Sequence, residues 1–193
     1  MKKTHLRYRG LEFRVPRFEL YPRLEARDSK HSSVIVGDIE VRGTAEFLVR
    51  TREALALLCP ARRLEFVQTN IAVIQQAHRS GMKAWLKRPT FAVGKATWQH
   101  SAIWYAGAIA HDAYHSKLYR EAKKAFGDAE PDVHLWTGAG AEKQCLEFQW
   151  QVLQELNADS KTLAYVEQCA KNPTYQGRNQ GWRGWLDYRK RWW

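Results

Sequence analysis

Hydrophobic and polar residues first alternate along the chain and then recur at helical spacing. The segment SSVIVGDIEVRG, residues 32–43, has β-branched residues on both sides of Gly37 and Asp38, which is typical of a hairpin with a tight turn. Thr44 can then cap a helix of about three turns that ends before Pro60. The apolar positions of this helix are Phe47, Leu48, Leu55 and Leu58.

A second helix is predicted after Pro60, because apolar residues continue at three- and four-residue steps. These residues are Leu64, Val67, Ile71 and Ile74. We expect this helix to end near Ser80 and Gly81. The next stretch contains Pro89 among β-forming residues, which predicts an irregular loop followed by a short edge strand at residues 91–94.

The longest predicted helix runs from Thr97 to Phe126, with Gly127 as its C-terminal cap. Its first half is apolar on all sides, which indicates burial, whereas its second half is charged and should reach the surface. A further helix is predicted at residues 141–156, and Asp159 can cap a last one that ends near residue 170. The pattern thus predicts an α+β fold, mostly helical, with a small N-terminal sheet or hairpin and one long buried helix.

The net charge of +11 is concentrated at the two ends of the chain. Residues 1–30 carry nine Lys and Arg against four Asp and Glu, and residues 171–193 carry six against one. The residues between them are almost neutral. We therefore expect a basic N-terminal arm or edge strands at 1–30, one globular domain at 31–171, and a basic, Trp-rich tail at 172–193.

The terminal charge raises the question of nucleic-acid binding. The near-neutral centre and the lack of a recognised nucleic-acid motif make such a partner unlikely, although the tail could also bind a membrane surface or dock on the protein itself. No apolar run is long enough for a membrane span, and the N-terminus lacks the apolar core of a signal peptide, so a cytoplasmic location is expected. Three cysteines without CxxC spacing predict buried free thiols.

The candidate chemistry lies in the long helix, at His111-Asp112-Ala113-Tyr114-His115. Residues four apart on a helix share one face, so both imidazoles can reach a single metal ion from adjacent turns. The alternative is that internal hydrogen bonds satisfy these buried polar groups, with Glu142, Tyr114 or backbone carbonyls as partners. The spacing alone leaves both readings open.

The segment AIAHDAYHSKLY resembles the zinc helix of the zincin metallopeptidases, with Asp112 in place of the Glu of the HExxH motif. The following predicted helix is similar to the gluzincin helix that supplies a third ligand. Glu142 shares a helix face with Leu146 and Gln149, so it is preferred to Glu147 for that role.

This resemblance implies a zincin-like fold, Zn²⁺ held by His111, His115 and Glu142, and a peptide or protein substrate. Asp112 would act as the catalytic base, and His134, in the loop between the helices, is a candidate donor to the transition state. The aspartate side chain is one methylene shorter than glutamate, which leaves a second hypothesis open: a metal-binding zincin-like domain with weak or no activity. The third hypothesis is a basic nucleic-acid-binding protein.

Overall fold

The computed structural model describes residues 5–8, 11–14 and 32–171. The strands are β1 (His5–Tyr8), β2 (Leu11–Arg14), β3 (Ser32–Val36), β4 (Ile39–Gly43), β5 (Val73–Gln76), β6 (Gly81–Lys83) and β7 (Thr90–Val93). The helices are α1 (Ala45–Leu58), α2 (Arg63–Asn70), α3 (Lys95–Trp98), α4 (Ala102–Phe126), α5 (His134–Thr137), α6 (Ala139–Glu155) and α7 (Ser160–Lys171). The chain therefore has the α+β character that the hydrophobic pattern predicts.

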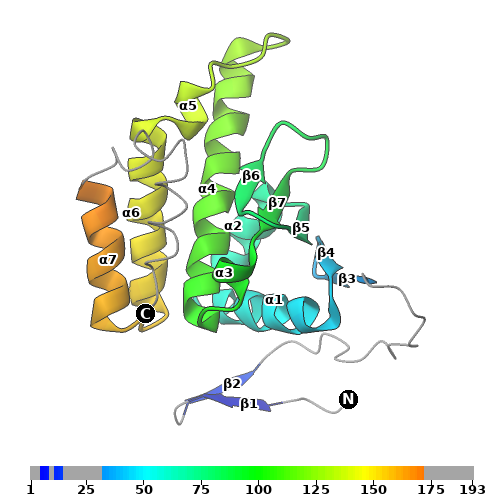
Figure 1. The fold of residues 1–193 in the computed structure, drawn as a ribbon, viewed down its shortest axis with the longest axis vertical. Coiled ribbons are helices and arrows are strands. Elements are labelled where there is room, and N and C mark those ends of the chain that lie inside the picture. The colour runs from blue at the N-terminus through cyan, green and yellow to red at the C-terminus, as the bar shows by residue number, and fades with distance from the viewer. Residues whose placement is uncertain (1–4, 9–10, 15–31, 172–193) are drawn as a thin grey trace.

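Five strands form one mixed sheet in the order β3-β4-β5-β7-β6 (Figure 1). The inner pairs β4–β5 and β5–β7 are parallel, whereas the outer strands β3 and β6 run antiparallel to their neighbours. Strands β1 and β2 form a separate antiparallel pair. The remainder of the predicted arm and the whole predicted tail at 172–193 lie outside the described residues.

The predicted hairpin and its following helix are confirmed. Val36 pairs with Ile39 across the two-residue turn, and Gly37 has a φ of 59°, a conformation that glycine adopts without steric cost. Thr44 caps α1 by accepting a hydrogen bond from the backbone N–H of Phe47. All four predicted apolar positions of α1 are buried.

The prediction of one helix from Leu64 to Ser80 is wrong. Helix α2 ends at Asn70, Ile71 has extended backbone angles, and the next residues form β5 in the middle of the sheet. The reason is that Val73 and Ile74 pair with strands on both sides, a tertiary preference that outweighs the helical spacing of their side chains.

The predicted edge strand at 91–94 is also misplaced within the sheet. Strand β7 lies between β5 and β6, and all four of its residues are buried. The short strand β6 occupies the edge instead. A fully buried strand needs an apolar sequence on both faces, which TFAV provides.

The long helix is confirmed with one interruption. Residues 95–98 form the separate turn α3, and Ser101 starts α4 by accepting a hydrogen bond from the N–H of Trp104 at 3.1 Å. His100 therefore precedes α4, the helix that carries His111. The helix is buried in its first half, emerges into solvent in its second half, and ends at Gly127, as predicted.

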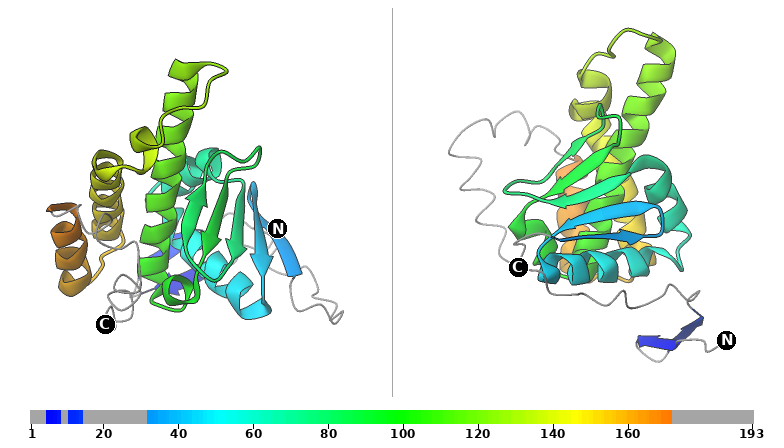
Figure 2. Two further views of the ribbon diagram at one scale, coloured as in Figure 1. Left: turned by 45° about the horizontal axis from the view of Figure 1, so that its top comes forward. Right: turned by 90° about the vertical axis from the view of Figure 1, so that its right-hand side faces the viewer.

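Helix α4 lies between the sheet and α6, and α7 packs on the outer side of α6 (Figures 1 and 2). Gly107 allows close approach of α4 to α6, because a Cβ at this position would lie 2.8 Å from Leu153 Cδ2. Asp159 caps α7 through the N–H of Thr162, as predicted. Among the described residues, no helix combines the length and the apolar character that crossing a bilayer requires.

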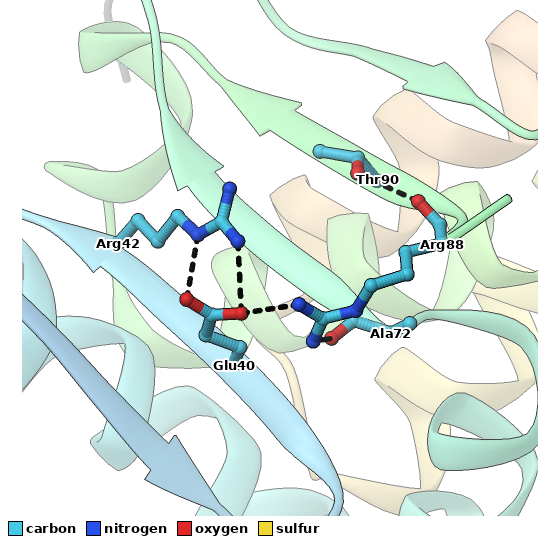
Figure 3. Close-up of polar contacts among 5 residues, drawn as sticks. All are labelled: Glu40, Arg42, Ala72, Arg88 and Thr90. Atoms are coloured by element: carbon cyan, nitrogen blue, oxygen red, sulfur yellow. Dashed lines mark hydrogen bonds and ion pairs between the residues drawn. The ribbon is translucent and has the colours of Figure 1, made fainter. Parts of the chain in front are cut away.

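One ion-pair network holds the sheet face opposite α4 (Figure 3). Glu40 on β4 accepts hydrogen bonds from Arg42 at 2.7 Å and from Arg88, which precedes β7. The hydrogen bonds of the two guanidinium groups lower the pKa of Glu40 to about 2.

We expect this network to make the protein sensitive to acid. A lowered pKa stabilises the fold above the ordinary value of 4.5, and this contribution is lost as the pH falls from 4.5 through about 2. Urea unfolding across this range should therefore show a steeper loss of stability in the wild type than in Glu40→Gln. Parallel pH profiles for the two proteins would contradict the assignment.

Candidate metal centre

Three helices bring the candidate residues together. His111 and His115 lie on consecutive turns in the middle of α4, and Glu142 lies in the first turn of α6. The short helix α5 joins the two and supplies the backbone carbonyl of Trp136. The N-terminal turn of α6 favours a carboxylate, because the helix dipole is positive there.

The imidazole rings of His111 and His115 approach each other through their Nε2 atoms. The Nε2 atoms of His111 and His115 are 3.1 Å apart, and the ring centroids are 4.8 Å apart. Two ring nitrogens that both carry lone pairs repel each other at this distance, so a proton or a cation must lie between them. The helical spacing thus produces the convergence that the sequence predicted.

Glu142 closes the third side of this group. One carboxylate oxygen is 3.1 Å from His115 Nε2, and the other is 3.6 Å from His111 Nε2. The side chain of Glu142 is almost completely buried, whereas Glu147 is exposed and pairs with Lys143. The structure therefore places Glu142, and not Glu147, beside the histidines, as the helix phase indicated.

The second nitrogen of His115 fixes the orientation of its ring. His115 Nδ1 is 2.7 Å from the carbonyl oxygen of Trp136, and only a protonated Nδ1 can donate to a carbonyl. The indole of Trp136 is in turn held between the rings of Trp85 and Tyr119. Nε2 of His115 is therefore directed towards His111 and Glu142, an arrangement that typically supports a metal-ligating histidine.

The hydrogen-bond partners of His115 control its charge. Burial lowers the pKa of His115, but hydrogen bonds with Cys145 and Glu142 outweigh burial and raise it overall. For Glu142, burial acts to raise the pKa, whereas the hydrogen bonds of both histidines lower it well below its usual range. In the absence of a metal, a proton on His115 is therefore stabilised by an ionised Glu142.

Cys145 joins the site, which the sequence did not predict. One ligand atom each from His111, His115 and Cys145 lie within 4.8 Å of one another, and Cys145 is fully buried. Burial raises the pKa of the Cys145 thiol. A sequence signal was present, because Cys145 follows Glu142 by three residues and so shares its helix face.

The two proposed catalytic residues differ in their placement. Asp112 as a whole residue is partly exposed to solvent. Its carboxyl group is nevertheless desolvated by the surrounding protein, which raises its pKa to about 6. His134 is the first residue of α5, and its side chain is exposed. Its role as a transition-state donor stays a prediction.

The donor chemistry of this site fits a metal ion. His111, His115 and Cys145 form a group that could hold one, and the carboxylate of Glu142 lies against both histidines. His111 Nδ1 is buried, and within the described residues it has no hydrogen-bond partner. The structure thus supports a metal-binding group at this helix interface.

Comparison of the chain with family models, curated proteins and solved structures found no match.

Proposed function

We propose that this chain binds zinc through His111, His115 and Glu142. The observation that carries the proposal is the convergence of two imidazole Nε2 atoms and one carboxylate inside the protein, with all three separations between 3.1 and 3.6 Å. Imidazole and carboxylate ligands suit zinc, and two histidines with one glutamate are a ligand set of catalytic zinc sites.

The reaction that we propose is hydrolysis of a peptide bond. Bound zinc would supply an activated water and polarise the substrate carbonyl. Asp112, next to the first histidine, would accept the proton of that water. A general base works best when its pKa is near the working pH, and burial raises the pKa of the Asp112 carboxyl in the metal-free protein.

The sheet offers support for a peptide substrate. Strand β6 is one of the two edge strands of the sheet and contacts α4, and among the described residues its outer edge has no strand partner, so it can pair with an extended peptide. Trp85, in the loop after β6, keeps about half of its surface exposed while it contacts Trp136. The proposed peptide would bind along β6.

A second candidate is a metal-stabilised domain without catalysis. The position of Cys145 favours it, because a fourth protein donor leaves no place for water on a tetrahedral ion. Binding energy of such a metal contributes directly to folding stability.

The substitution Asp112→Glu separates these two candidates. We expect zinc binding to be retained and peptide hydrolysis to rise on the order of tenfold, because the longer side chain reaches the water better and a general base is worth roughly 10²–10⁴ in rate. Asp112→Asn is the matched control. Its side chain cannot accept the proton, so this variant should show no rise in peptide hydrolysis. Full zinc occupancy with no cleavage of a mixed peptide library by wild type or Asp112→Glu would favour the non-catalytic domain.

A further inference from the structure

We infer that Cys145 supplies a thiolate as a fourth ligand, so that His111, His115, Glu142 and Cys145 close the metal site against water. The inference rests on the metal binding proposed above and assigns a role to a residue outside the zincin pattern. A tetrahedral ion held by all four residues has no place for water, so this inference favours the metal-stabilised domain over peptide hydrolysis.

The geometry of α6 places the thiol at the site. Cys145 lies one helical turn after Glu142, and both side chains are buried against α4. The sulfur lies within 4.8 Å of one ring nitrogen of each histidine. Two residues of α4 and two of α6 therefore face one another across a single helix interface.

The chemistry of the four donors supports the assignment. Zinc in a closed site takes four ligands in a tetrahedral arrangement, and mixed nitrogen and sulfur donors are common there. A thiol that coordinates a metal ion does so as the thiolate, after losing its proton. The other two cysteines, Cys59 and Cys169, are only partly buried and do not belong to this group.

Cobalt(II) provides the test, because it substitutes for zinc in such sites and its thiolate complexes absorb in the near ultraviolet through sulfur-to-cobalt charge transfer. The full chain is freed of metal with a chelator and titrated with Co²⁺ under reducing conditions. We expect the charge-transfer band to rise to one equivalent together with the visible bands of tetrahedral cobalt. Cys145→Ser should lose the charge-transfer band and keep bound cobalt, whereas Cys59→Ser should retain both.

The outcomes distinguish the two proposals. Visible cobalt bands without charge transfer in the wild type, or charge transfer that survives Cys145→Ser, would overturn the thiolate ligand and leave the histidine–glutamate site standing. Failure of the wild type to bind cobalt or zinc would overturn both. If Cys145→Ser does not fold, the Cys59→Ser/Cys169→Ser double variant replaces it: Cys145 is then the sole thiol, and loss of the band refutes the assignment.

Discussion

The His111→Ala/His115→Ala double variant is expected to lose its metal completely, while the wild type contains close to one zinc per chain. Each substitution removes a ligand, and removal of even an outer-shell partner of a ligand typically costs about 10–100-fold in affinity. Loss of two ligands should therefore reduce the affinity for zinc by more than about 100-fold. Mass spectrometric measurement of metal content in untagged protein gives the answer.

His78→Ala is the matched control for this experiment, because His78 is an exposed histidine outside the three helices of the site. It should bind as much zinc as the wild type. A wild-type protein that is folded but metal-free, even after incubation with zinc, would contradict the prediction. The site would then be a hydrogen-bonded polar cluster in the core, in which one proton is shared among His111, His115 and Glu142.

The helical part of this fold was readable from the sequence because its signals are local. The caps at Thr44, Gly127 and Asp159 act within a few residues of the chain, and the structure confirms each of them. The β5 segment was not readable in the same way. Its apolar residues fit a helical and a strand pattern equally, and only its pairing with β4 and β7, which lie far away in sequence, decides between them.

In the candidate site too, the features set by local helix geometry were predictable, whereas those set by the packing of separate elements were not. The convergence of His111 and His115 follows from helix geometry alone, and the inward direction of Glu142 follows from the phase of α6. The carbonyl of Trp136 that orients His115 could not be predicted, because it depends on how α5 joins two helices. Cys145 could have been found from its helix face, but its buried apolar surroundings favoured a structural thiol.

Substitution of Glu142 should reveal how strongly the buried charges of the metal-free site depend on one another. We expect Glu142→Gln to lower the free energy of unfolding by about 2 kcal/mol at pH 6 in the presence of a chelator, because a hydrogen bond to a charged group contributes roughly 1.5–3 kcal/mol. The cost is limited, since His115 can release its proton once the carboxylate is gone. Urea unfolding followed by circular dichroism measures the difference.

The difference in unfolding free energy between the wild type and Glu142→Gln should depend on pH, because the pKa values of Glu142 and His115 are shifted in opposite directions. The lowered pKa of Glu142 contributes stability above the ordinary value of 4.5, and the raised pKa of His115 contributes stability that declines as the pH rises above 6.5. The wild type should therefore exceed Glu142→Gln most between pH 4.5 and 6.5. Glu147→Gln, on the exposed face of the same helix, should change stability by less than about 0.5 kcal/mol throughout. Equal effects of the two substitutions would show that the buried carboxylate does not hold the His115 charge.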